Sequence, residues 1–227
     1  MKPYLAFITV GVVALTALAG SPLLCQTMQP RRVTIPADET MSGRSAAAKS
    51  VHIRGNPDAP VTLEEFGDFE CPSCKNLATF LDQLVKDYHP RLRLIFHNFS
   101  LPMHQFARDA ALAAEAAGLQ GRYWEMHDIL FREQAVWSSA TDARLLFDTY
   151  AETLGLDLDQ FRKDVKSDNV RERVESDQAR AKSLGVKTAP TLFVDKREMG
   201  PNERNPEGVR KLVEEAVKAN SSASEKR

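Results

Sequence analysis

The sequence predicts an α/β domain that is interrupted by an all-helical insertion. Short apolar runs at 61–66, 92–99 and 191–194 have the length and composition of buried strands. An amphipathic helical pattern lies between the first two runs, and the order strand, helix, strand is typical of a parallel pair with a crossover helix. From 105 to 184 the chain shows helical patterns without a strand signal, which indicates a helical insertion before the third strand.

The crossover helix is predicted from its start, its apolar stripe and its end. It begins at Pro72, because the missing N–H of proline has no helical partner in the first turn. Apolar residues then recur every three or four positions and form one stripe: Leu77, Phe80, Leu81, Leu84, Val85 and Tyr88. The pair His89-Pro90 predicts the end of this helix.

Five helices are predicted in the insertion. We place them at 105–117, at 123–131, from behind Thr141 to Gly155, in a short segment after Asp157, and at 168–184. Asp157 with Gln160 resembles a capping box, and Gly185 is a C-terminal stop. After the third strand, the sequence predicts a turn at 195–200 with a short return strand, and a last helix that begins at Asn205-Pro206-Glu207.

The first 24 residues predict export. Lys2 supplies a positive start, 5–18 is almost wholly apolar, and Ala17-Leu18-Ala19 offers the small residues that signal peptidase reads. We therefore expect residues 1–24 to be a signal peptide that is cleaved after Ala19.

Two alternatives to cleavage stay open. The apolar run nearly reaches the ~20 residues that span a bilayer, so 4–24 would serve as a membrane tether if it is not cleaved. Lipidation of Cys25 is a third interpretation, although Leu24 is larger than the residue that usually precedes a lipidated cysteine. In each case we expect a periplasmic or other extracytoplasmic protein, either secreted or membrane-tethered.

The remaining chain is expected to form one domain between two polar segments. Residues 25–50 are polar without sustained periodicity and predict a linker. The globular domain is expected over 51–220, with the insertion at about 104–184, and 221–227 is predicted to be a disordered tail. Because 30 Lys and Arg balance 31 Asp and Glu, without a basic cluster interleaved with aromatics, nucleic acid is excluded as a partner.

Two of the three cysteines, Cys71 and Cys74, lie at the predicted junction of strand and helix. A pair this close closes almost no loop and adds little stability, so it suggests chemistry. The start of a helix favours a thiolate at Cys71, whereas Cys74 lies one turn inside and is shielded from solvent. This asymmetry suits thiol–disulfide exchange, in which Cys71 attacks and Cys74 resolves the mixed disulfide.

A structural zinc site is the main alternative for this pair. Such a site needs four ligands, but the chain has no second CxxC, and its five histidines show no paired ligand spacing near the first. We therefore expect no metal and no cofactor other than the redox-active Cys71–Cys74 disulfide. A chemically inert pair is the other alternative.

Three stretches of this sequence resemble the DsbA-like branch of the thioredoxin fold. They are Phe-Gly-Asp-Phe-Glu-Cys-Pro-Ser-Cys at 66–74, His-Asn-Phe-Ser-Leu-Pro-Met-His at 97–104 and Gly-Val-Lys-Thr-Ala-Pro-Thr-Leu-Phe-Val at 185–194. The resemblance covers about residues 51–218. It implies a thioredoxin fold, with a mixed central sheet flanked by helices and an all-helical insertion, and it implies a protein disulfide oxidoreductase.

The resemblance also implies roles for further residues. Pro190 would be cis and lie against the cysteines, so that Thr188, Ala189 and Pro190 bind an extended substrate by its backbone. Glu65 would lie under the active site with a raised pKa and take the proton from the buried thiol. An ordinary trans proline and a solvated acid at the end of a strand are the alternatives.

The predicted function is that of a dithiol oxidase that donates its disulfide to unfolded or partly folded exported proteins. A membrane redox partner would reoxidise it. Ser73 stands where the strongest oxidants of this family carry histidine, which favours a milder oxidant. A reductase or isomerase of the same fold, reduced by a membrane donor, is the first alternative, and a peptide-binding or chaperone-like module is the second. His97 and His104 are interpreted as structural or surface residues.

Overall fold

The computed structural model describes residues 52–224. The predicted leader at 1–24, the linker at 25–50 with Cys25, and residues 225–227 lie outside the described residues. Five strands of the described part form one mixed sheet in the order β1-β3-β2-β4-β5. These strands are β1 Ile53–Gly55, β2 Val61–Gly67, β3 Leu92–Asn98, β4 Thr191–Val194 and β5 Arg197–Glu198.

The centre of the sheet is the parallel pair that the sequence predicts. β2 pairs in parallel with β3, and helix α1, Pro72–Asp87, connects them. β4 pairs antiparallel with β2 on its other side, and β1 and β5 are antiparallel edge strands. The mixed sheet and its helices confirm the predicted fold class.

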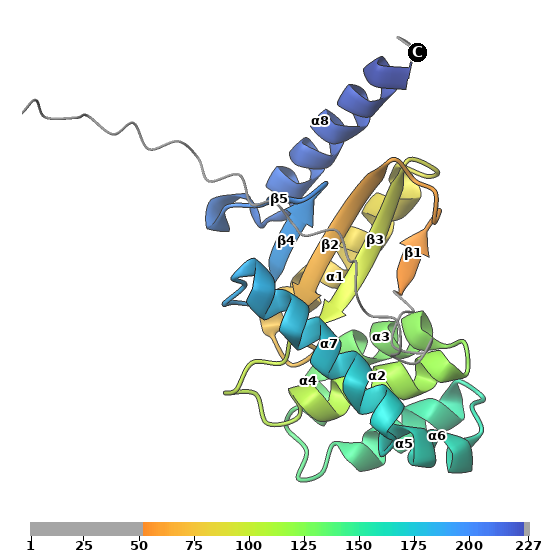
Figure 1. The fold of residues 1–227 in the computed structure, drawn as a ribbon. Coiled ribbons are helices and arrows are strands. Elements are labelled where there is room, and N and C mark those ends of the chain that lie inside the picture. Colours follow the sequence, from red (N-terminus) through yellow and green to blue (C-terminus); the bar gives the residue numbers. More distant parts are fainter. Residues whose placement is uncertain (1–51, 225–227) are drawn as a thin grey trace, which may run out of the picture. The chain divides into compact units, whose positions relative to one another are not determined.

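Two helices pack on one face of the sheet and a third packs on the other. Apolar residues of α1 and α8, Pro206–Ser224, share one buried cluster with Leu63 and Leu94. Helix α7, Asp168–Leu184, lies on the opposite face (Figure 1). Its Ala181 packs there with Phe66 and Phe193. Because side chains alternate along a strand, Glu65 lies on the α1 face of β2 and Glu64 on the α7 face.

The predicted insertion is helical throughout. Its elements are α2 Ala107–Leu119, α3 Tyr123–Arg132, α4 Gln134–Trp137, α5 Arg144–Thr153, α6 Leu158–Val165 and α7. Helices α2 to α6 gather beyond the carboxyl ends of β2 and β3 (Figure 1). Buried alanines on α2 allow close packing against these helices, and the resulting core includes both Cys71 and Cys74. The insertion therefore forms part of the surroundings of the two cysteines.

Three features differ from the sequence prediction. β1 was not predicted, because a three-residue edge strand is defined by its pairing with β3 and has no pattern of its own. The single-turn helix α4 was also missed. The predicted tail at 221–227 is wrong for 221–224: α8 continues through Ser224, and the side chains of Ser221 and Ser222 donate to the carbonyls four residues earlier. Between 52 and 224, no helix is both long enough and apolar enough to cross a bilayer.

Candidate active site

The two cysteines occupy different environments at the start of α1. Cys71 is the residue that caps the helix, with extended backbone angles, and Cys74 lies inside the first turn. Both thiols are free, and Cys71 is 7% exposed whereas Cys74 has no exposed surface. Cys71 thus keeps a small exposed surface and Cys74 keeps none, so the two sulfurs differ in the predicted direction although both residues are buried.

The surroundings of these thiols separate their acidities. The hydrogen bond from the Cys74 thiol, with the backbone N–H groups of Ser73 and Cys74, lowers the pKa of Cys71 to about 6, although burial opposes the shift. Burial is the main cause that raises the pKa of Cys74 well above its ordinary value. At neutral pH the pair therefore holds a thiolate at Cys71 and a proton at Cys74.

Glu65 is the acid beneath this pair. Its side chain is buried on the α1 face of the sheet, and its Oε1 has no hydrogen-bond partner in the described part of the chain. Burial, followed by the charge of Cys71, raises the pKa of Glu65 to about 8. Such an acid is protonated at neutral pH and can still give up its proton.

A glycine makes room for this acid. A Cβ at Gly67 would lie 3.1 Å from Oε1 of Glu65 and only 2.4 Å from Cε2 of Phe96. Both distances are tighter than ordinary contacts, so a larger residue would force the ring of Phe96 to move. The absence of a side chain at this position thus keeps Glu65 and Phe96 in place.

The segment 188–190, which we call the cis-proline loop, lies against Cys71. The Ala189–Pro190 peptide bond is cis, and the Cys71 Sγ lies 3.5 Å from the carbonyl oxygen of Ala189, to which it donates only while it is protonated. The contact joins residues 118 positions apart in the sequence. It places the reactive sulfur next to a backbone edge that an extended peptide can pair with.

Sequence reasoning missed Arg204, which donates hydrogen bonds to this loop. Its Nη1 donates to the Thr188 hydroxyl and to the Pro190 carbonyl, each at 3.2 Å, and its Nε donates to the Met199 carbonyl at 3.0 Å. An arginine in a turn between a strand and a helix carries no sequence signal for this role. The hydrogen-bond partners of Arg204 are decided by the tertiary fold, which brings residues 188–190 close to its side chain.

Two further polar residues support the backbone around Cys71. Gln134, on the unpredicted helix α4, donates from Nε2 to the carbonyls of Phe69 and Cys71, at 2.7 and 3.0 Å. His104 contacts Asp68 three residues before Cys71, whereas His97 lies on the α7 face between Glu64 and Asp177. The two histidines, interpreted from the sequence as structural or surface residues, thus differ in place: His97 lies away from the cysteines, and His104 contacts the turn that leads to Cys71.

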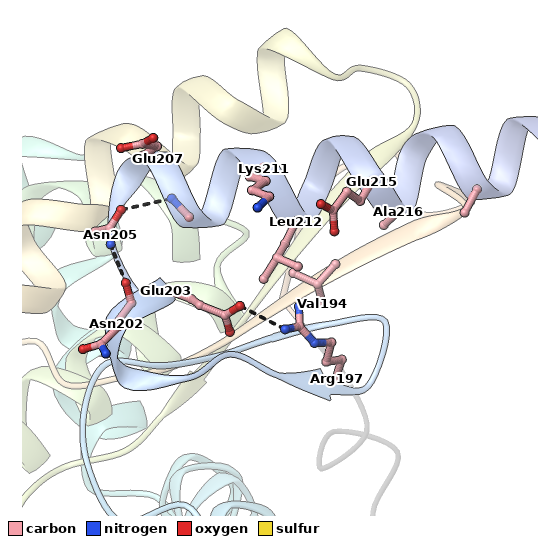
Figure 2. A pocket seen from close by; sticks show the side chains of 12 residues that line it. Val194, Arg197, Asn202, Glu203, Asn205, Glu207, Lys211, Leu212, Glu215 and Ala216 are labelled. Carbon is pink, nitrogen blue, oxygen red and sulfur yellow. Dashed lines mark hydrogen bonds and ion pairs between the residues drawn. The ribbon is translucent and has the colours of Figure 1, made fainter.

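A wide cleft lies away from the two cysteines. It measures about 740 Å³ and runs between α8, the β4–β5 turn and the short helix η2, Pro201–Glu203 (Figure 2). An Arg197–Glu203 ion pair crosses it, and none of its lining residues belongs to the predicted site. Between 52 and 224, no group of three or more His, Cys, Asp or Glu residues is arranged to hold a metal ion.

This arrangement is that of a thioredoxin-fold protein. It combines two cysteines at the start of a helix with a cis proline beside them at the end of a mixed sheet. The thioredoxin family model matches residues 47–215, and the chain belongs to this family.

Solved structures agree with this fold. A thioredoxin-like oxidoreductase from Silicibacter pomeroyi is 25% identical with a TM-score of 0.60, and the match covers 76% of this chain and 92% of that one. BdbD from Bacillus subtilis is 24% identical with a TM-score of 0.65, and covers 73% and 92%. The family match and these structures confirm the predicted thioredoxin fold.

The curated relatives are much longer proteins. Over 156 residues the chain is 42% identical to the Na(+)/H(+) antiporter NhaA 1 of Mycolicibacterium gilvum, which covers 66% of this chain and 24% of that protein. This chain therefore spans about a quarter of the length of the curated relatives it matches.

Proposed function

We propose that this protein is an extracytoplasmic thiol–disulfide oxidoreductase that donates its Cys71–Cys74 disulfide to exported proteins. The observation that carries the proposal is the contact between Cys71 Sγ and the Ala189 carbonyl, 3.5 Å apart, with the Cys71 pKa lowered to about 6. A reactive sulfur beside the backbone of the cis-proline loop suits a substrate that presents a cysteine in an extended segment.

The exchange takes place in two displacements. A client thiolate attacks Cys71 Sγ of the protein disulfide; a client–Cys71 bond forms, and the electron pair of the broken bond goes to Cys74. Glu65 would protonate this leaving sulfur. A second client thiolate then attacks the client sulfur of the mixed disulfide, and Cys71 leaves as a thiolate. The client loses two electrons, and the protein gains them as a dithiol.

The acidity of Cys71 favours the oxidising direction. A stabilised thiolate in the reduced state makes the disulfide a stronger oxidant, and a pKa of about 6 lies well below the ~8.5 of a free cysteine. We expect a potential above that of thioredoxin, ~−270 mV, and below that of the strongest oxidant of the family, ~−120 mV. A membrane redox partner would restore the disulfide. Reductase or isomerase activity is the alternative if that partner supplies electrons.

Client recognition would rest on the cis-proline loop. The backbone of Ala189 would pair with the client segment that carries the attacking cysteine, while Thr188 and Pro190 flank it. Backbone is common to every peptide, so this mode of binding favours unfolded or partly folded proteins of many sequences. The apolar leader, as a cleaved signal or as a tether, would bring the domain to such clients.

A refolding assay tests the activity. The oxidised protein is mixed with a reduced, denatured disulfide protein, and client disulfides are counted after acid quenching. Cys71→Ala should abolish transfer, because it removes the attacked sulfur. Cys74→Ala is supplied with Cys71 in a mixed disulfide with glutathione; a client thiolate attacks Cys71 Sγ, glutathione leaves as a thiolate, and a client–Cys71 mixed disulfide should accumulate because no Cys74 resolves it. Cys25→Ala, which removes the remaining cysteine, is the matched control and should leave transfer intact. Full transfer by both Cys71→Ala and Cys74→Ala would refute the proposal.

The direction of electron flow is tested in cells. Thiols are trapped with a maleimide after acid quenching, and the redox state of the Cys71–Cys74 pair is read from the mobility of the protein. A mostly oxidised pair is the expected result. A mostly reduced pair would make reductase or isomerase the correct description.

A further inference from the structure

Asp68 places a buried carboxylate beside both cysteines. It precedes Cys71 by three residues, and its side chain has no exposed surface. Its backbone carbonyl accepts from the Cys71 N–H at 3.1 Å, and its own N–H donates to Cys74 Sγ at 3.4 Å. The carboxylate therefore belongs to the same turn as the thiols.

A buried anion at this position opposes the thiolate. The Asp68 charge raises the pKa of Cys71 and so acts against the hydrogen bonds that lower it. Burial also makes an uncompensated carboxylate costly, so such a group is normally paired with a positive charge or with several donors. The hydrogen-bond and charge partners of Asp68 therefore determine how strongly its carboxylate raises the pKa of Cys71.

Two of these partners are neutral and one is titratable. Oδ1 accepts from the Glu70 N–H at 2.7 Å, and Oδ2 accepts from the Leu101 N–H at 2.7 Å. Oδ2 also lies 2.8 Å from Nδ1 of His104, whose side chain is 21% exposed. Among the side chains of 52–224, His104 alone donates to the Asp68 carboxylate, and its imidazole can carry a positive charge.

The other charged side chains nearby do not neutralise the Asp68 carboxylate. Glu70 is itself an acid, and its Oε2 accepts from the Phe106 N–H at 2.6 Å. Glu65 is the buried acid below the pair, and Lys75 directs its ammonium to the Arg132 carbonyl at 3.4 Å. Among the described groups that contact the Asp68 carboxylate, the imidazole of His104 is therefore the source of positive charge.

We propose that His104 is a positioning residue for the exchange reaction: it neutralises Asp68 and thereby supplies, from the entrance to the helical insertion, the positive charge that Pro72-Ser73 lacks. This inference rests on the proposed function and assigns a role at the same site. The positive charge lies on residue 104, outside the CxxC motif. It affects Cys71 Sγ because it neutralises the buried Asp68 carboxylate.

The protonation state of His104 has a direct consequence for the sulfur. Although burial opposes it, the hydrogen bond and charge of Asp68, with the charges of Glu70 and Cys71, raise the pKa of His104 and favour its charged form. With imidazolium present, Asp68 is paired and the Cys71 thiolate is favoured. Without it, the full Asp68 charge acts on Cys71, so the thiolate is less stable and the disulfide is a weaker oxidant.

The test replaces the charge while it keeps a donor. His104→Gln can still donate to Asp68 but is neutral, and His104→Lys keeps a positive charge. For each full-length reduced protein, the ultraviolet absorbance of the Cys71 thiolate is titrated against pH, with the matching Cys71→Ala protein subtracted. The equilibrium with reduced and oxidised glutathione is measured in parallel. His89→Gln removes an exposed histidine elsewhere and serves as the matched control.

The expected result is specific to a charge effect. His104→Gln should raise the midpoint of the Cys71 titration by about 0.5–1 pH unit and lower the oxidising equilibrium constant about 3- to 10-fold. His104→Lys should recover at least half of both changes. In proteins that also carry Asp68→Asn, His104→Gln should change both quantities less, because the carboxylate charge that His104 neutralises is absent.

Two results would overturn the inference. In the first, His104→Gln changes the midpoint of the Cys71 titration and the glutathione equilibrium constant no more than His89→Gln does. This result counts against the inference even if His104→Gln lowers the melting temperature. The other is an equal change for His104→Gln and His104→Lys, which would indicate packing in place of charge. The titration needs no client, so its outcome is independent of whether the wild-type protein oxidises clients.

Discussion

Glu65→Gln should make the protein more stable at high pH and abolish part of the pH dependence of its stability. Glu65 is fully buried, and its pKa is raised from 4.5 to about 8. Between these two values the folded chain binds one more proton than the unfolded chain does. The free energy of unfolding must therefore fall as the pH rises from about 4.5 to about 8.

The size of this effect follows from the shift. Each unit is worth 1.36 kcal/mol, so the 2.5 units between 4.5 and 7 correspond to about 3 kcal/mol of stability lost by pH 7. Gln cannot ionise, so the variant lacks this loss, although its buried amide adds a constant cost of about 1–3 kcal/mol if it finds no partner. The difference between the two proteins should change by about 3–4 kcal/mol from pH 5 to pH 8.

Chemical denaturation of the reduced proteins at several pH values between 5 and 8 measures this difference. Other groups that titrate in this range are common to both proteins and cancel in the comparison. Cys71 is the exception, because its charge is coupled to that of Glu65, so its titration contributes to the measured difference. Glu172→Gln, an exposed acid on α7, is the matched control and should show a constant difference. A difference for Glu65→Gln that stays flat within about 0.5 kcal/mol would refute the raised pKa.

Three further outcomes are expected. Alkylation of the reduced protein at Cys71 should accelerate with pH through a midpoint near 6, and a midpoint near 8.5 would contradict a stabilised thiolate. Gly67→Ala should cost about 1–3 kcal/mol in thermal unfolding, because its Cβ would meet Phe96, and an unchanged melting temperature would show that the ring yields freely. Arg204→Gln should raise the KM for a cysteine-containing peptide several-fold by loosening the cis-proline loop, whereas Arg197→Gln should leave it unchanged.

The elements that the sequence predicted well are those with local signals at both ends. Helix α7 begins and ends where it was expected, because the Ser167 side chain accepts from the Val170 N–H and Gly185 takes up a left-handed conformation. β4 was likewise found within its bounds. Edge strand β1 has no such signal, since its three residues form a strand by pairing with β3.

The residues of the candidate site also differ in whether a local sequence signal predicts them. The character of Cys71 could be predicted because it depends on its place at a helix start, which is encoded within a few residues. For Glu65, the family resemblance implied a place under the active site. Strand alternation puts its side chain on the face opposite to that of Glu64, and the structure shows that α1 covers this face. Family resemblance placed the cis-proline loop beside the cysteines, and the chain itself contains no local signal for a contact across 118 positions.

The sequence by itself determined the order of the elements, the pair of thiols and the asymmetry between them, because capping, periodicity and helix polarity act over a few residues. The tertiary structure decided which buried charges face one another. It set Glu65 under the cysteines without a partner for its Oε1, joined Asp68 to His104, and put Arg204 behind the cis-proline loop. Burial and long-range pairing set the energy of a charge, and both depend on segments that only the folded chain brings together.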